Sequence, residues 1–256
     1  MVFDNTATDL GTVIQVRHLM TPIGLVRPVR DEDQAEAVYE RLLAKNYFAT
    51  AVFSGNEVTG WVAREDLAKH SGGRIEPARQ GLSADVLIGA GSAVDGLLER
   101  FREHNFLLVV GEWGIEGIVT PSDIGRQAGR MHLFMQVCAL ELALASLARL
   151  QDDLTSVVAQ VLTGERRRRL QASLEKKADL GEVTDLVAEF SFNDLLRVGQ
   201  LLVKGWADVE RAQLDELNDF RNSVVHMALE VADDGGVAIR RVLSNLDLVH
   251  RLLVAM

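Results

Sequence analysis

The chain has 256 residues, 48% of them hydrophobic, a formal net charge of −10 and a single cysteine. This length favours two domains with separate cores. The acidic balance argues against a protein that binds nucleic acid over a broad surface, and we expect no DNA partner. One cysteine cannot form an internal disulfide, and the apolar helical surroundings of Cys138 favour a buried structural thiol.

No targeting or membrane segment is expected. The first ten residues, MVFDNTATDL, lack the basic flank and the apolar centre of a signal peptide. No uninterrupted apolar run approaches the roughly 18 residues that a membrane span requires. The sequence therefore predicts a soluble, cytoplasmic protein without a membrane partner.

Backbone chemistry divides the chain near residues 125–132. All four prolines and 15 of the 21 glycines lie within residues 1–130, where turns must be frequent. The remaining residues contain no proline and few glycines, as expected of long helices. We predict an α+β domain over residues 1–128, followed by an all-α helical bundle over residues 131–256.

The first half contains an internal repeat, with copies at about residues 10–70 and 78–128. The segment KNYFATAVFSGNEVTGWVAREDLA, from Lys45, aligns with HNFLLVVGEWGIEGIVTPSDIG, from His104. This alignment matches Asp66 with Asp123. Each copy predicts an amphipathic helix (residues 35–46 and 93–105), two short strands joined by a turn, and a short helix that starts near the aspartate.

The two copies resemble a tandem pair of CBS domains. VRHLMTP opens the first copy, and the signature Gly-x-hydrophobic-Thr-x-x-Asp occurs in the second as GIVTPSD. The resemblance implies an adenosine nucleotide (AMP, ADP or ATP) as regulatory ligand, with Asp123 accepting hydrogen bonds from the ribose and Thr120 contacting ribose or phosphate. A carboxylate suits this role because it is an acceptor only, whereas two vicinal hydroxyls are donors.

The first copy departs from this signature. Asp66 is present as a second candidate ligand-binding residue, but Ala63 occupies the position of Thr120, so one hydroxyl contact is missing. We therefore expect the site of Thr120 and Asp123 to be the better one. Alternatively, each aspartate only caps the short helix that it precedes, which is a common role for aspartate.

In the second half, an apolar pattern at helical spacing runs over residues 131–162, long enough for eight turns or more. Gly164, Gly181 and the pair Gly235 and Gly236 are natural breaks. The sequence therefore predicts a bundle of four or five helices.

A run of four arginines is the densest positive cluster in the chain. These candidate RNA-contact residues are Arg166, Arg167, Arg168 and Arg169. In an acidic protein they are the first place to expect phosphate contacts. Alternatively, the run is a solvated helix face with Glu165 and Glu175 as its partners.

Residues 220–226, FRNSVVH, place Arg221 and Asn222 shortly before His226. Asn222 and His226 are four residues apart and share a helix face, so the amide can orient the imidazole. Arg221 precedes His226 by five residues, so its guanidinium must reach round the helix. No His, Cys or carboxylate cluster has metal-binding spacing, and no metal is expected.

This motif resembles the signature of the HEPN superfamily, Arg-polar-x-x-x-His with Asn commonly the polar residue. FSFNDLL and ALELALASL fit the same family more loosely. The resemblance implies a metal-independent endoribonuclease with an active site across a homodimer interface, RNA as substrate, and Arg221, Asn222 and His226 as catalytic residues. Histidine suits proton transfer near neutral pH, and arginine suits the developing charge on phosphorus. Ala228 replaces a tyrosine found in some toxin members.

The combined interpretation is an adenine-nucleotide-regulated, metal-independent endoribonuclease that acts as a homodimer. We expect the dimer to bury apolar helix faces of residues 131–162 and the region 221–229. Alternatively, the helical domain only dimerises, or binds RNA or a protein partner without catalysis. In that case His226 packs in a helix interface and Arg221 pairs with a nearby acid such as Asp219 or Glu216.

Overall fold

The computed structural model describes residues 14–70, 72–182, 185–226 and 237–256. They form two compact units, which are described separately. The first unit contains the described residues up to His132 together with 237–243, and the second contains 133–226 together with 244–256. The division lies close to the predicted boundary. The start of the last helix, residues 237–243, is grouped with the first unit and not with the second.

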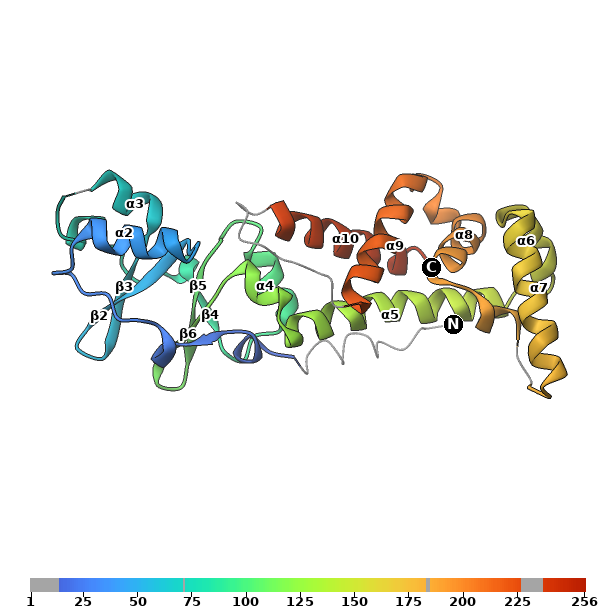
Figure 1. Cartoon of the computed structure of the whole chain (residues 1–256), viewed down its shortest axis with the longest axis horizontal. Helices are drawn as coiled ribbons and strands as arrows, with labels where there is room; N and C mark the ends of the chain where they lie inside the picture. Colours follow the sequence, from blue (N-terminus) through green and yellow to red (C-terminus); the bar gives the residue numbers. More distant parts are fainter. Residues whose placement is uncertain (1–13, 71, 183–184, 227–236) are drawn as a thin grey trace. The chain divides into compact units, whose positions relative to one another are not determined.

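The first unit is α+β, as predicted, and both copies of the repeat have the same order of elements (Figure 1). Its strands are β1 (Thr21–Pro22), β2 (Ala49–Ser54), β3 (Glu57–Ala63), β4 (Leu87–Gly89), β5 (Leu107–Gly111) and β6 (Gly114–Val119). Its helices are α2 (Ala35–Ala44), α3 (Arg64–Lys69) and α4 (Val94–Arg100), with 3-10 turns η1 (Val16–His18), η2 (Ile23–Leu25), η3 (Glu76–Ala78), η4 (Ala84–Val86) and η5 (Pro121–Gly125). Each copy thus contains the predicted helix, strand hairpin and short helical segment.

The two copies exchange the strands that lead into them. β1, at the start of the first copy, pairs antiparallel with β6 of the second, with Thr21 opposite Ile118. The resulting sheet has the order β1-β6-β5-β4, in which β4 runs parallel to β5. Reciprocally, Gln80 at the start of the second copy forms a bridge with Trp61 of β3, the partner of β2. Each copy is therefore completed by a segment of the other.

The glycine of the repeated signature makes room for the exchanged segment. A Cβ atom on Gly117 would lie 2.6 Å from Met20 Sδ and 2.8 Å from the carbonyl oxygen of Thr21. A Cβ atom on Gly60, the equivalent residue of the first copy, would overlap the carbonyl oxygen of Gln80. Only glycine allows the backbones to approach this closely.

Gly117→Ala is expected to lower the free energy of unfolding of the first unit by about 2 kcal/mol, because the added methyl group must push β1 away from β6. Gly24→Ala is the matched control, since nothing lies within 4 Å of a Cβ atom at that position. Urea denaturation followed by circular dichroism compares the two variants. Equal midpoints would contradict this explanation of the glycine.

An apolar core joins the two hairpins of the first unit. Its buried members are Ala49, Ala51, Phe53, Phe106, Leu108 and Ile118. Trp61 of β3 stacks on Phe106, which directly precedes β5, with ring centroids 5.5 Å apart. A separate core lies between α2, α3 and their hairpin, around Leu42 and Leu67.

The second unit is helical, as predicted. Its helices are α5 (Gln127–Arg149), which begins in the first unit, α6 (Leu154–Val161), α7 (Gly164–Asp179), α8 (Phe192–Leu202), α9 (Arg211–Val225) and the end of α10 (Val237–Val254), with turns η6 (Leu186–Glu189) and η7 (Lys204–Trp206). The described part of the chain therefore has six α-helices after Arg126, not four or five. The break at Gly164 was predicted, because α7 starts there.

The apolar pattern over residues 131–162 is divided between two helices. α5 ends at Arg149, and α6 begins at Leu154. Between them Asp153 is the N-cap of α6, and its carboxylate accepts a hydrogen bond from the Ser156 N–H at 3.0 Å. The apolar periodicity continues across this break, and the capping aspartate ends the helix.

Close packing in the second unit depends on Trp206 and a glycine of α8. Trp206 is fully buried, and its indole N–H donates to the carbonyl oxygen of Leu252 at 3.1 Å. A Cβ atom on Gly199 would lie 2.6 Å from both Leu144 Cδ2 and the Trp206 ring. The absence of a side chain at Gly199 therefore brings α8 close to α5 and η7.

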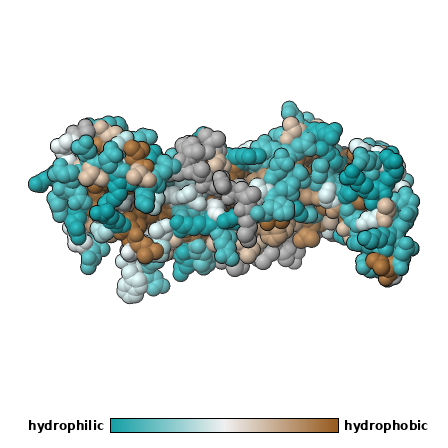
Figure 2. Space-filling view, in the orientation of Figure 1, coloured by the Kyte–Doolittle hydropathy of each residue, from teal (hydrophilic) through white to brown (hydrophobic). Residues whose placement is uncertain are grey.

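α5 is the one helix among the described residues that is long and apolar enough to cross a membrane, with a mean hydropathy of 1.6 over an 18-residue window. Length and composition alone do not separate a membrane span from the core helix of a soluble protein. α5 buries Leu140 and Leu144 in its unit but exposes Phe134 and Leu142. Brown, apolar surface is visible over this helix in Figure 2.

Candidate functional site

Asp123 lies buried in η5, in the turn that follows the signature strand β6. Its Oδ2 atom accepts hydrogen bonds from the backbone N–H of Thr120 at 2.7 Å and from the Thr120 hydroxyl at 3.1 Å. Its Oδ1 atom pairs with Nη2 of Arg126 at 2.8 Å. Both carboxylate oxygens thus have partners inside the protein. The bond from the Thr120 N–H caps the start of η5, as in the capping alternative.

Arg126 also holds the exchanged strand. Its guanidinium donates to the carbonyl oxygen of Leu19 at 3.3 Å and to the hydroxyl of Thr21 at 3.0 Å. Burial raises the pKa of Asp123, and the hydrogen bonds from Thr120 and the charge of Arg126 oppose this rise. The buried carboxylate of Asp123 therefore needs hydrogen-bond donors around it. Ribose hydroxyls are also hydrogen-bond donors.

Asp66, the equivalent residue of the first copy, is more accessible, with 23% of its side chain exposed against 4% for Asp123. Its Oδ1 accepts from Lys69 Nζ at 2.9 Å, and its Oδ2 accepts from Gln80 Nε2 at 2.6 Å. The hydrogen bond from Lys69 is the main reason that the pKa of Asp66 lies below its usual value. No side chain caps α3, so the capping alternative is wrong for Asp66.

The repeat places the same kinds of group around both aspartates. Lys69 and Arg126 each follow the aspartate by three residues and pair with it. Gln80 and Thr21 both come from exchanged segments. Gln80 donates to Asp66, and Thr21 accepts from Arg126. The sequence motifs point to the aspartates but not to these four residues. The doubled spacing Asp-x-x-Lys/Arg is the signal that reveals the two cations.

In the helical unit, Arg221 of α9 pairs with Glu141 of α5. Arg221 Nη2 lies 3.4 and 3.3 Å from the two carboxylate oxygens of Glu141. The suggested pairing with Asp219 or Glu216 is therefore wrong. Glu141 was overlooked, although a lone acid inside the apolar stretch ALELALASL is a visible signal. The pair is half-buried, so Arg221 occupies a partly desolvated position.

The structure brings Asn222 to Arg221 but not to His226. The Asn222 amide oxygen accepts from Arg221 Nη1 at 3.4 Å, so the expected orientation of the imidazole by this amide is not observed. His226 is exposed at the end of α9, where its backbone N–H donates to the Asn222 carbonyl at 2.9 Å. Its ring has no hydrogen-bond partner within the described ranges. Ala228 lies outside the described residues.

Solved CBS-domain pairs resemble part of this chain. A CBS domain-containing protein of unknown function from Bacillus anthracis is 19% identical, over 45% of this chain and 93% of its own, with a TM-score of 0.40. The CBS domain of a bacterial CNNM/CorC-family Mg²⁺ transporter in complex with ATP is 20% identical, over 46% and 89%, with a TM-score of 0.39. CBSX2 in complex with AMP is 20% identical, over 46% and 97%, with a TM-score of 0.40.

No protein-family model and no curated protein matches the chain. The CBS-like structures cover less than half of it, and TM-scores of 0.40 or below assign no function to it. The resemblance to HEPN domains therefore rests on the sequence motif. Both functional interpretations depend on the residues described above.

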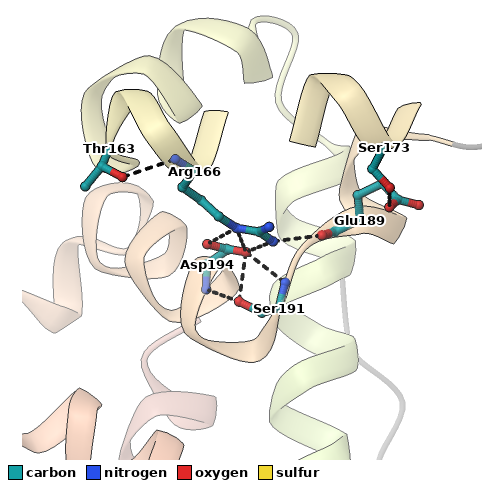
Figure 3. Close-up of polar contacts among 6 residues, drawn as sticks. All are labelled: Thr163, Arg166, Ser173, Glu189, Ser191 and Asp194. Atoms are coloured by element: carbon teal, nitrogen blue, oxygen red, sulfur yellow. Dashed lines mark hydrogen bonds and ion pairs between the residues drawn. The ribbon is translucent and has the colours of Figure 1, made fainter. Parts of the chain in front are cut away.

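Arg166, the first of the four arginines, is part of an internal ion pair (Figure 3). Its Nε lies 3.2 and 3.0 Å from the two carboxylate oxygens of Asp194, and its Nη2 donates to the Glu189 carbonyl at 3.0 Å. Asp194 is 5% exposed and also accepts from the backbone N–H and the hydroxyl of Ser191, each at 2.8 Å. Arg166 therefore fastens α7 to the start of α8, and its contact with RNA stays a prediction.

The other three arginines are exposed. Arg169 pairs with Glu165 one turn earlier, as the solvated-face alternative predicts. Arg167 and Arg168 form no ion pair with any described residue. Glu175 accepts from Gln171 instead of from an arginine. RNA contact by these three arginines stays a prediction.

Cys138 is half-buried on α5, whereas the sequence favoured a buried structural thiol. Burial, followed by the nearby charge of Glu141, raises the pKa of the Cys138 thiol, which stays protonated at neutral pH. Across the described part of the chain, no three His, Cys, Asp or Glu side chains come together as metal ligands.

Proposed function

We propose that the first unit binds an adenine nucleotide at Asp123 and Asp66 and that the helical unit carries the regulated response. The observation that carries this proposal is the doubled signature, in which each aspartate is held by a cation three residues later. Each carboxylate accepts hydrogen bonds from side chains, and ribose hydroxyls offer donors of the same kind. AMP and ATP, which are bound in two of the similar structures, are the first ligands to test.

Asp123→Ala is expected to weaken nucleotide binding by at least about tenfold, because a buried carboxylate contributes on the order of 1.5–3 kcal/mol through hydrogen bonds. Calorimetry with AMP, ADP and ATP on the full chain measures the change, and Asp66→Ala tests the second copy. Glu99→Ala is the control, since Glu99 is an exposed acid that pairs with Arg102. Circular dichroism checks folding. Equal affinity for wild type and Asp123→Ala would remove Asp123 from the site.

A second candidate function is metal-independent RNA cleavage at the motif of Arg221, Asn222 and His226. It is favoured by an exposed imidazole at the end of α9 and by a half-buried guanidinium five residues earlier on the same helix. Acid–base cleavage needs one group to remove a proton and another to supply one. Each chain contributes one such histidine, so this function requires a homodimer.

The exposed face of α5 supports such a homodimer. Phe134, Cys138 and Leu142 follow one another at four-residue spacing and share a helix face, which is 39% exposed at Phe134 and 68% at Leu142. The stripe is uncharged, and an exposed apolar helix face of this kind suits burial against the same face of a second copy. Glu141, which holds Arg221, is the neighbour of Leu142. A dimer formed there brings two motifs near one interface.

Leu142→Glu is expected to convert the dimer into a monomer, because each interface would then bury an unpaired charge. Light scattering at micromolar concentration measures the mass. Leu180→Glu is the matched control, since Leu180 is also 68% exposed but lies at the end of α7. A monomeric wild type would exclude both the dimer and the two-histidine mechanism, and would leave the nucleotide-binding regulator as the better interpretation.

A further inference from the structure

We propose that Arg126 is a gate: the nucleotide must displace it from Asp123, and its release loosens the exchanged strand β1 and the first turn of α5. This inference rests on the proposed nucleotide site and adds a mechanism by which occupancy of that site is transmitted. Arg126 qualifies because it touches the carboxylate, the strand and the helix at once.

The side chain of Arg126 makes three contacts. Its guanidinium pairs with Asp123 Oδ1 at 2.8 Å, and it donates to the Leu19 carbonyl at 3.3 Å and the Thr21 hydroxyl at 3.0 Å. Its backbone carbonyl accepts from the Arg130 N–H at 2.9 Å, which starts α5. The side chain of Arg126 thus joins the candidate ligand carboxylate to the residues around β1, and the backbone of the same residue starts α5 within the first unit.

The two oxygens of Asp123 differ in what a ligand can replace. Oδ2 accepts from the backbone and hydroxyl of Thr120, and these bonds also fix the turn η5. Within the described part of the chain, Oδ1 pairs with Arg126. A ribose hydroxyl that binds Oδ1 must therefore take the place of the guanidinium, because a buried carboxylate without a donor is costly.

The Arg126 guanidinium can move into solvent when it leaves Asp123. The Arg126 side chain is 54% exposed, whereas Asp123 is 4% exposed, so rotation of Arg126 into solvent costs little desolvation. Its departure removes side-chain bonds from Leu19 and Thr21 at the moment when the ligand supplies a new donor to the aspartate. Part of the binding free energy is thus used to release β1. Ligand binding at Asp123 and the packing of β1 are therefore coupled.

The first copy lacks this link. The Lys69 side chain is 68% exposed, and its ammonium group donates to Asp66. The bond from Gln80 joins Asp66 to the exchanged segment, but no helix comparable to α5 follows. Ligand binding at Asp66 is therefore expected to leave β1 and α5 unchanged.

The test uses the full chain as wild type, Arg126→Ala and Arg102→Ala. Arg102 is the matched control because it also pairs with an acid three residues away, Glu99, in the same copy. Calorimetry with AMP is expected to show binding about tenfold tighter for Arg126→Ala, as expected when a charge-assisted bond that competes with the ligand is removed. Hydrogen exchange should be faster across residues 19–22 and 127–131 in AMP-bound wild type and in ligand-free Arg126→Ala, and unchanged in Arg102→Ala.

Thr21→Val provides a second test that leaves Asp123 paired, in case Arg126→Ala does not fold. It removes the Thr21 hydroxyl contact and should tighten AMP binding about twofold to threefold, the effect of one weak hydrogen bond. If AMP binds wild type and neither variant binds more tightly, the gate is overturned and the nucleotide site stands. If AMP, ADP and ATP bind to none of the proteins, the proposed site and its gate both fail.

Discussion

Arg166→Ala is expected to lower the free energy of unfolding of the helical unit by about 3 kcal/mol, the usual cost of removing one partner from a buried ion pair. The reason is that Asp194, which is 5% exposed, would keep its charge and lose its cation. Only the bonds from Ser191 would then support the carboxylate. Urea denaturation followed by circular dichroism measures the loss.

Arg167→Ala is the control, because Arg167 is the next residue of α7 and is exposed. It should change the free energy of unfolding by less than about 0.5 kcal/mol. Replacing Arg166 and Asp194 together should cost less than the sum of the single replacements, since the uncompensated charge is then gone. Equal effects of Arg166→Ala and Arg167→Ala would show that the pair in Figure 3 does not stabilise the unit.

The same ion pair predicts a dependence on pH. Burial by itself raises the pKa of Asp194, but the hydrogen bonds from Arg166 and Ser191 outweigh it and lower the pKa below its usual value. A carboxyl group with a lowered folded-state pKa stabilises the fold above its unfolded pKa, and this contribution is lost as the pH falls through the folded pKa. Wild type should therefore lose more stability in acid than Arg166→Ala, and the difference between the two should disappear once the pH has fallen below the folded pKa of Asp194.

His226→Ala is expected to reduce RNA cleavage by about a thousandfold, the usual contribution of a general acid or base. His226 is exposed, so its removal should leave the fold and the dimer unchanged. The assay is gel electrophoresis of mixed single-stranded RNAs in EDTA, with and without AMP. Products should end in a 2′,3′-cyclic phosphate and a 5′-hydroxyl, because the 2′-oxygen attacks the adjacent phosphorus, loses its proton to a base, and displaces the 5′-oxygen, which takes up a proton.

His250→Ala is the matched control, as His250 is an exposed histidine of α10. Asn222→Ala should cause a smaller loss than His226→Ala, and the loss should act through Arg221, because the Asn222 amide bonds to that guanidinium. Cleavage that survives in His226→Ala would indicate a contaminating nuclease or a different site. If wild type cuts no RNA with or without AMP, the helical unit is better explained as a dimerisation or partner-binding module.

The order of elements in the first unit was predictable because its signals are local and occur twice. Alternating apolar residues predict the hairpins, and the aspartates mark the turns after them. The exchange of strands was not predictable, since the pairing of Thr21 with Ile118 joins residues from different copies and leaves no local pattern. The cations Lys69 and Arg126 were missed although their spacing repeats.

In the helical unit, apolar periodicity predicted helices and overestimated their length. It continues through the break at Asp153, where a capping side chain decides the end of one helix and the start of the next. The role of Arg166 depends on Asp194, 28 residues later in the chain, so composition alone suggested a surface patch. The pairing of Arg221 with Glu141 is equally non-local, because the partners are 80 positions apart in the sequence.

The exchange of strands has a consequence for how the chain reaches its native state. During synthesis β1 emerges first, but β6, its partner, is not complete until Val119 has been made. The first copy must likewise wait for Gln80. Such distant pairings raise the contact order and the entropy lost on closing the loop, so folding of this unit should be slow compared with that of the helices that follow. A ribosome-bound first copy is thus an incomplete sheet with an open edge. The two copies must pair with one another before the strand edges of either copy are protected from aggregation.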